Sequence, residues 1–542
     1  MRKNELTELA VTLILGWVTV AWLFPVGALL GGEYAIGDST RDLFDHLFLL
    51  DQWTTVARGW NFPDGGRIMP PDISGMLFAL PWFWLGRVTA YNLALLTQFT
   101  LTLWAGWLLG RQFGSGLVAG LAMGLSPIFI SQLVSGEAET ASAWTIPLFL
   151  YMLSKPHPNW AWRVGIVAAI SGLLSWYYGV YVGLVLVGHS IYKSRFWTGK
   201  LVWAAFKPVS ICLACIAPFA IWYGRILISG NELFRGLTMT DYMMSHPRAL
   251  ASFSADPLAW FFGSQYAASH SDFLGWLPLV FMGIGSVVLY RQSRFWALCF
   301  GTIILGAATF SLGPVLHFRG NPVFEALPYR ALLYVPVFDL MRLPHRWMML
   351  LVAASLPFIA AACRQNGLLF AGLLVAEVVW FSSPMCSLTE IRTPSIIDEY
   401  KGAILELPAR TMGDDARGQY LLWQRVHEQP IPYSLLMTGW SSIVTHEPLV
   451  HWVSAQDSRD PIGERVVEAE QFRQGEFAAA VSDVKVQALE GAKDRLLEKG
   501  LWGVVLHLNL LEPANATVIQ RMLEAQLGSP HFENDEAVLW KL

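Results

Sequence analysis

The sequence predicts a polytopic α-helical membrane protein with about 10 to 13 transmembrane helices and a C-terminal α/β domain. The first observation is composition: 54% of the residues are hydrophobic and only 14% are charged, whereas an ordinary soluble domain is about 25% charged. The second is that the deficit is uneven, because only 18 of the 41 acidic residues precede residue 385. The chain therefore divides into a multi-pass membrane part, 1–384, and a soluble part, 385–542.

Long uncharged stretches support the membrane assignment, because a bilayer core needs about 20 apolar residues in a helix. The stretch 163–192 is long enough for two short helices, with a break near 175–179. The segment 73–86 is too short for a comfortable span, so we expect a re-entrant or half helix there. The remaining candidates are 9–30, 90–109, 115–133, 140–154, 203–224, 274–290, 295–312, 346–363 and 367–382.

The C-terminal part has the pattern of alternating strands and helices that is typical of an α/β domain. Short apolar runs predict strands at 403–407, 503–507 and 537–541, and amphipathic segments predict helices at 485–499 and near 517–526.

Positive charges predict the orientation, since short loops rich in Lys and Arg stay on the cytoplasmic side. Arg2 and Lys3 place the N-terminus in the cytoplasm. Alternation then places three long loops and everything after residue 384 outside. These loops are 31–72, 225–272 and 313–345. If 73–86 is a half helix, residues 135–139 also lie outside.

The first outer loop carries four carboxylates in fourteen residues, among them Asp38, Asp42 and Asp45, with His46 beside them. If the loop is helical, the spacing of the three aspartates puts them on one face. Like charges repel, so such a face suggests a general base or a site for a cation. The alternative is a solvated surface helix.

Two further groups of charges lie in outer loops on this topology. Glu137 and Glu139 form a second acidic pair, which either joins the first or only keeps its helices apart. Arg330, Arg342 and Arg346 flank a short proline-bearing apolar segment. Guanidinium groups bind phosphate in a bidentate manner, so this stretch suits a lipid phosphate, or it anchors a helix end at the interface.

An ionisable residue, Glu377, lies within the last predicted membrane helix. A charge there is unfavourable in lipid, so we expect it to make a structural hydrogen bond. No basic tract indicates a nucleic-acid partner.

The order of these features resembles bacterial GT-C type glycosyltransferases, whose relatives include oligosaccharyltransferase catalytic subunits and protein O-mannosyltransferases. The matching stretches are the acidic loop from Gly37 to His46, Pro70-Pro71-Asp72, Ser175-Trp176-Tyr177-Tyr178, Ala255-Asp256 through Trp260, Phe273-Leu274-Gly275, Leu327-Pro328 through Arg346, and Leu405-Glu406-Leu407-Pro408. These enzymes use sugars linked to a polyprenyl phosphate.

The resemblance implies an inverting sugar transfer at the outer face of the bacterial plasma membrane, in the cell envelope, with a polyprenyl-phosphate-sugar donor. The acceptor would be a glycan, a lipid or a protein. Asp38 or Asp42 would be the general base. Supporting acidic or metal-binding positions would be Asp45, His46, Glu137 and Glu139, and the donor phosphate would be bound by Arg342, Arg346 and Arg330. No cofactor is required, although the acidic cluster permits a divalent cation such as Mg²⁺ or Mn²⁺.

Three other functions remain open from the sequence. A transporter or flippase predicts intramembrane charges and repeated halves, but the chain shows Glu377 and no repeat. A polysaccharide polymerase or ligase would use an arginine and histidine site, which residues 342–346 could provide. The third is a membrane scaffold with a working C-terminal domain.

Overall fold

The computed structural model describes most of the chain, and its residues fall into two compact units. The first unit lies within 1–37, 72–225 and 250–389, and the second within 38–71, 226–249 and 390–542. The described residues are 3–37, 43–50, 62–63, 73–155, 157–194, 199–229, 254–262, 273–319, 321–335, 341, 343–381, 388–408, 415–433, 441–456, 489–511 and 513–542.

The first unit is built from apolar helices. In the described part of the chain, four segments are long and apolar enough to cross a membrane, or up to five if a bent pair counts as one span. By length and composition, the protein is therefore a multi-pass membrane protein. The expected total of 10 to 13 crossings stays a prediction. The four segments are Asn4–Leu23, Arg87–Gly110, Arg294–Ser311 and Pro344–Ala362.

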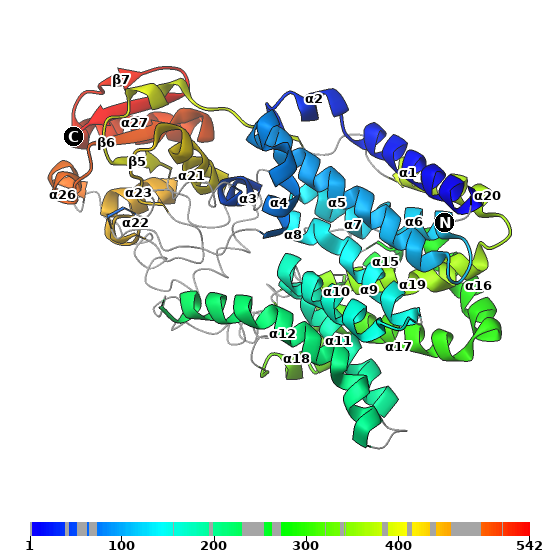
Figure 1. The fold of residues 1–542 in the computed structure, drawn as a ribbon. Helices are drawn as coiled ribbons and strands as arrows, with labels where there is room; N and C mark the ends of the chain where they lie inside the picture. The colour runs from blue at the N-terminus through cyan, green and yellow to red at the C-terminus, as the bar shows by residue number, and fades with distance from the viewer. Residues whose placement is uncertain are drawn as a thin grey trace. The chain divides into compact units, whose positions relative to one another are not determined.

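Helix α5 (Arg87–Gly110) is the central helix of this unit and is buried over most of its length. It contacts α1 (Lys3–Leu23), α6 (Gly116–Gly124), α9 (Thr145–Ser154) and α19 (Met348–Ala362) (Figure 1). Its interior also holds polar side chains, including Asn92 and Gln98, which donate to carbonyl groups of neighbouring segments. Buried amides need such partners because an unpaired polar group is unfavourable away from water.

Two predicted interruptions are confirmed, and a third interruption, which the sequence does not predict, lies within a predicted span. The segment 73–86 is short, with α4 (Ile73–Ala79) followed by the 3-10 turn η1 (Leu80–Leu85). The stretch 163–192 is broken at Ser175 between α10 (Trp160–Leu174) and α11 (Trp176–Ser194).

The stretch 115–133 was expected as one helix but is bent by 43° between α6 and α7 (Pro127–Ser135). Pro127 has no backbone N–H, and Ser126 caps the new helix by accepting from the N–H of Phe129. These two residues therefore end one helix and begin the next.

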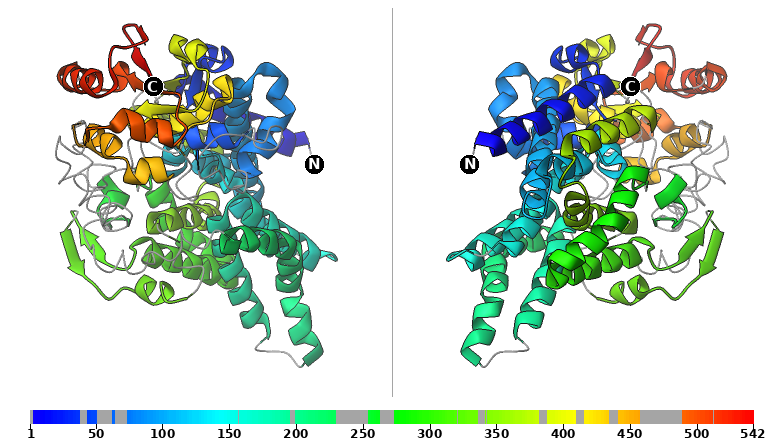
Figure 2. Two further views of the ribbon diagram at one scale, coloured as in Figure 1. Left: turned by 90° about the vertical axis from the view of Figure 1, so that its left-hand side faces the viewer. Right: turned by 90° about the vertical axis from the view of Figure 1, so that its right-hand side faces the viewer.

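Shorter elements complete the first unit. Strands β2 (Leu316–Phe318) and β3 (Asn321–Phe324) form an antiparallel hairpin, which is seen in Figure 2, and β1 (Tyr34–Ile36) pairs with β4 (Leu388–Glu390). The other elements are α2 (Val26–Leu30), α8 (Ala138–Ala141), η2 (Ser142–Trp144), α12 (Gly199–Ser229), α15 (Ala259–Phe262), α16 (Trp276–Gln292), α17 (Arg294–Ser311), α18 (Pro328–Leu332), η5 (Pro344–Trp347) and α20 (Gly367–Phe381).

The structural role predicted for Glu377 is confirmed. Its carboxylate, on α20, accepts hydrogen bonds from the backbone N–H groups of Trp276 and Leu277, the latter at 3.1 Å. These two groups open α16, where N–H groups have no partner within the helix. Glu8 does the same for α6, since its Oε1 accepts from the N–H of Leu117 at 2.9 Å.

The second unit contains a four-stranded sheet in the order β5-β6-β8-β7. Strands β5 (Ile404–Leu407) and β6 (Gly503–His507) are parallel, and β8 (Ala537–Lys541) is antiparallel to β6 and to β7 (Phe532–Glu533). All three predicted strands are confirmed within one residue. The predicted helix at 485–499 is shorter, because helix α26 spans only Ala492–Glu498.

Helices complete the core of the second unit, and Figure 1 shows α21 (Asp415–His427) and α27 (Pro513–Leu527) beside the sheet. The apolar side of α27 follows helical spacing, with Ile519, Leu523 and Leu527 buried. Phe48, on α3 (Leu43–Leu49), is buried in this core, so the helix that follows the predicted aspartates packs with the C-terminal domain. Two short helices, α22 (Ser442–His446) and α23 (Pro448–Gln456), also belong to this unit.

Candidate functional site

The segment that carries Glu137 and Glu139 is a tight connection between two helices of the first unit. Helix α7 ends at Ser135, and Gly136 follows in the left-handed conformation with φ of 77°. Glycine adopts this conformation without strain, which makes it the usual residue for such a helix end. The chain then enters the four-residue helix α8, so the two glutamates lie on either side of its first residue.

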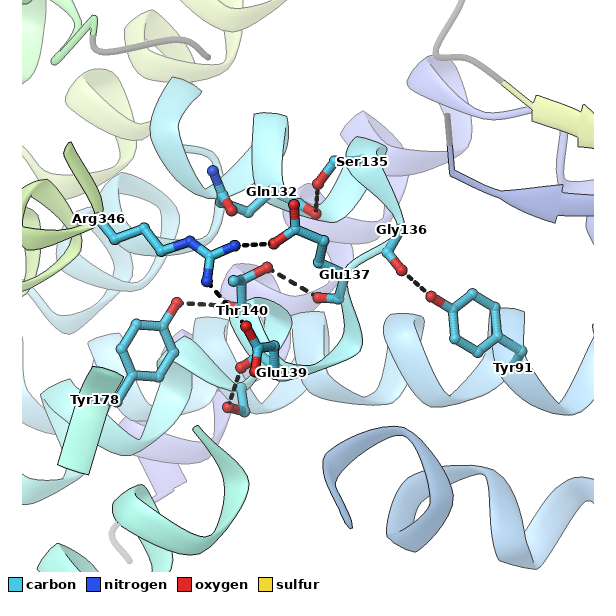
Figure 3. A network of polar contacts seen from close by, with 10 residues as sticks. Tyr91, Gln132, Ser135, Gly136, Glu137, Glu139, Thr140, Tyr178 and Arg346 are labelled. Atoms are coloured by element: carbon cyan, nitrogen blue, oxygen red, sulfur yellow. Dashed lines mark hydrogen bonds and ion pairs between the residues drawn. The ribbon is translucent and has the colours of Figure 1, made fainter. Parts of the chain in front are cut away.

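Arg346 approaches this segment from a region more than 200 residues later in the chain. Its guanidinium pairs with Glu137 through Nη2 and with Glu139 through Nη1, the second at 2.9 Å (Figure 3). The side chains of Arg346 and Glu137 are 7% and 6% exposed, whereas that of Glu139 is 32% exposed. The structure thus joins the second predicted acidic group to one predicted phosphate-binding arginine.

Aromatic residues at the start of α11 support this cluster. The guanidinium of Arg346 lies over the ring of Tyr177, 4.7 Å from its centroid. The start of α11 can lie close to α10 because Gly172 and Gly179 face each other, and a Cβ on Gly179 would lie 2.4 Å from the Cα of Gly172. The aromatic break noted in the sequence therefore forms part of the site.

The cluster contains one positive and two negative groups, so its formal charge is −1 if all three are ionised. Arginine stays protonated in proteins, which makes its charge permanent. Burying such charges is unfavourable by several kcal/mol per ion, at order of magnitude, unless they are paired. Paired charges retained among apolar helices point to a functional site more often than surface ion pairs do.

The other predicted site residues fall into three groups. Asp38, Asp42 and Arg342 lie outside the described residues. His46 and the backbone of Asp45 lie on α3 in the second unit. Arg330, on α18, donates from Nη1 to the backbone carbonyl of Glu325 at 2.9 Å.

A bound cation is not supported by the described residues. They contain no group of three or more His, Cys, Asp or Glu side chains arranged to hold a metal ion. Glu137 and Glu139 are both engaged by the guanidinium of Arg346. We therefore derive no step through Mg²⁺ or Mn²⁺.

The second unit has its own buried polar cluster, around Glu406 on β5. Glu406 is fully buried; its Oε1 lies 3.3 Å from Nε2 of His507 and accepts from the hydroxyl of Tyr400 at 3.4 Å. Burial raises the pKa of Tyr400 well above 10, and the neighbouring Glu406 adds to this effect. The pKa of His427 is lowered by burial, partly opposed by Glu406, with His507 lowering it further.

Sequence reasoning found Glu137, Glu139, Arg346 and the tyrosine pair, but missed several contributors. Tyr91 and Gln98 contact the glutamate segment from α5, where they read as ordinary residues of an apolar helix. Glu406 was detectable as a lone charge within the buried run Ile404–Leu407.

No family model and no curated protein matches the chain. Solved structures that it is similar to include the oligosaccharyltransferase AglB from Archaeoglobus fulgidus, in complex with an inhibitory peptide and a dolichol-phosphate. That match has 12% identity, covers 94% of this chain and 70% of that chain, and has a TM-score of 0.44.

ArnT from Cupriavidus metallidurans is a second similar structure. The apo form matches at 12% identity over 99% of this chain and 97% of that chain, with a TM-score of 0.40. The form bound to undecaprenyl phosphate matches at 12% identity over 97% of both chains, with a TM-score of 0.37. At such identities and TM-scores, we infer neither the fold nor the activity of this chain from these likenesses.

Proposed function

We propose that this protein is a membrane glycosyltransferase that takes a sugar from a polyprenyl-phosphate-linked donor at the outer face of the plasma membrane. The observation that supports this most is the buried cluster of Arg346 with Glu137 and Glu139. It unites two of the three charged regions that the family resemblance singles out. The third region contains the proposed general base, Asp38 or Asp42.

The two glutamates differ in a way that suits the binding of an anion. Glu137 is buried and holds one side of the guanidinium, whereas Glu139 is the more exposed partner. A phosphate oxygen of the donor would exchange with Glu139 at Nη1, because a partly exposed ion pair is weaker than a buried one and opens more readily. Arg346 would then keep one carboxylate and gain the phosphate.

The chemical step follows from the donor. An acceptor oxygen or nitrogen attacks the anomeric carbon of the sugar and gives its proton to the carboxylate of Asp38 or Asp42. The bond between that carbon and the phosphate oxygen breaks, and both electrons leave with the polyprenyl phosphate. Arg346 stabilises the negative charge that grows on the leaving phosphate, the kind of electrostatic effect that dominates many enzymatic rates.

Replacement of the first-loop aspartates tests this proposal. The full chain in proteoliposomes is given undecaprenyl-phosphate-linked hexoses and pentoses, one at a time, with a cell-envelope extract as the source of acceptor. Released undecaprenyl phosphate is measured. Either Asp38→Asn or Asp42→Asn, and the double variant, should lower release by about 100-fold or more, the usual contribution of a general base.

Glu33→Gln is the matched control, because Glu33 is an exposed carboxylate in the same outer loop. It should keep the release rate of the wild type. Normal release by both single variants and by the double variant would remove the first-loop carboxylates from the mechanism. Absence of release by the wild type from every donor would reject the glycosyltransferase proposal.

A further inference from the structure

Two side chains of α5 hold the backbone of the segment that carries the glutamates. The hydroxyl of Tyr91 donates to the carbonyl of Gly136, and Nε2 of Gln98 donates to the carbonyl of Ala138 at 3.1 Å. Tyr91 and Gln98 are seven residues apart, which places them on one face of the helix. Both side chains are fully buried.

A third donor comes from α11. The hydroxyl of Tyr178 donates to the carbonyl of Thr140 at 2.6 Å. Its neighbour Tyr177 lies beneath the guanidinium of Arg346. Consecutive residues of one helix thus contact the glutamate segment and its arginine partner. Figure 3 shows Tyr91 and Arg346 on opposite sides of that segment.

The three held carbonyls alternate with the two glutamates. A carbonyl belongs to the rigid peptide plane that ends at the Cα of the following residue. The hydrogen bond to the carbonyl of Gly136 therefore orients the plane that leads to Glu137. In the same way, the hydrogen bond to the carbonyl of Ala138 orients the plane that leads to Glu139.

We propose that Tyr91, Gln98 and Tyr178 are positioning residues for Glu137 and Glu139 in the sugar-transfer reaction. Their hydrogen bonds fix the backbone from which both carboxylates reach Arg346. This inference rests on the proposed function for its catalytic part only. A shift of about 1 Å in such a segment can lower a rate by about 100-fold, so removal of one hydroxyl should lower kcat.

Tyr178→Phe and Tyr181→Phe are a matched pair for the test. Both tyrosines are buried on α11, but the hydroxyl of Tyr181 has no hydrogen-bond partner within the described residues. The full chain in proteoliposomes is assayed with the undecaprenyl-phosphate-linked sugar that the wild type uses. Tyr178→Phe, and likewise Tyr91→Phe, should lower kcat by about tenfold and leave KM within about twofold, whereas Tyr181→Phe should match the wild type.

A second measurement is independent of activity. Glu139→Gln is combined with each tyrosine variant, and the shift in Tm is compared with the shift that Glu139→Gln causes in the wild type. We expect a smaller shift in the Tyr178→Phe background and an unchanged shift in the Tyr181→Phe background, because coupled residues are not additive. Hydrogen exchange of residues 137–141 should accelerate in the single variant Tyr178→Phe and stay unchanged in Tyr181→Phe.

The outcomes separate the two proposals. If the wild type transfers no sugar but the Tm coupling and the exchange effect are present, the proposed function fails and the positioning of the glutamates stands. If exchange accelerates without Tm coupling and without a fall in kcat, Tyr178 is merely structural and the inference is overturned. It is also overturned if Tyr178→Phe and Tyr91→Phe match Tyr181→Phe in every measurement.

Discussion

Two buried carboxylates, Glu137 in the first unit and Glu406 in the second, are stabilised by different partners. In the first unit, Glu137 pairs with the guanidinium of Arg346. In the second, Glu406 lies 3.3 Å from an imidazole nitrogen of His507 and accepts from the hydroxyl of Tyr400. The first partner is a guanidinium, which carries a permanent charge, whereas the partners of Glu406 are an imidazole and a phenol hydroxyl.

This difference suggests that the two clusters have different roles, one in binding an anion and one in structure. The guanidinium of Arg346 keeps its charge at any physiological pH, so it can bind a phosphate that takes the place of Glu139. The carboxylate of Glu406, on β5, contacts His507 on β6 and the hydroxyl of Tyr400 in the segment before β5. Glu406 therefore links these three neighbouring segments of the second unit's core, and the first cluster is the one that we propose for chemistry.

The largest expected effect concerns the two carboxylates of the first cluster. Glu137→Gln should lower the free energy of unfolding by about 1.5 to 3 kcal/mol, the usual range for a hydrogen bond to a charged group. Glu139→Gln should lower it by only about 0.2 to 1 kcal/mol, because that side chain is partly exposed and its ion pair is screened. Thermal unfolding of the detergent-solubilised chain checks the order. Equal losses would mean that the two ion pairs do not differ in the way their exposure indicates.

Glu377 offers a third way to hold a carboxylate, with backbone N–H groups in place of a cation. Glu377→Leu should lower the free energy of unfolding by about 1 kcal/mol, as the loss of a helix cap does. Glu377→Gln should lose less, because its amide oxygen still accepts from one N–H group of α16. Transfer activity should be unchanged in both variants. A large loss of activity without a loss of stability would assign Glu377 a role in function.

The smallest expected effect is a pH dependence of the stability of the second unit. The pKa of His427 is lowered in the folded chain, mainly by burial, and it is near 6.5 when the chain is unfolded. As the pH falls below about 6.5, the unfolded chain binds the proton more readily, so stability decreases until the folded pKa is reached. Hydrogen exchange of β5 and β6, corrected for the intrinsic rate, should show weaker protection at pH 5.5 than at pH 7.5.

His427→Asn is the control for this pH effect. Nδ1 of His427 accepts from the N–H of Gln429 at 3.0 Å, and an asparagine oxygen can take over that role. The variant should lose part of the pH dependence while keeping its protection at pH 7.5. The groups around this ring are Glu406, His507 and Tyr400. An unchanged pH dependence in the variant would mean that one of those groups, and not His427, causes the effect.

Much of the architecture was predictable from the sequence, because it depends on local patterns. Long uncharged runs identify membrane helices, and short apolar runs identify the strands 403–407, 503–507 and 537–541. The bend at Ser126-Pro127 was missed although both residues are visible signals, since the uncharged run continues through it.

What the sequence determined by itself was the class of the protein and the charged residues to examine, because composition, periodicity and the polarity of loops are properties of neighbouring residues. Only the tertiary structure decided that Glu137, Glu139 and Arg346 pair with one another, and that Tyr91, Gln98 and Tyr178 hold the segment between them. These contacts join residues that are tens to hundreds of positions apart. They depend on how α5, α11 and η5 pack, which no local pattern specifies.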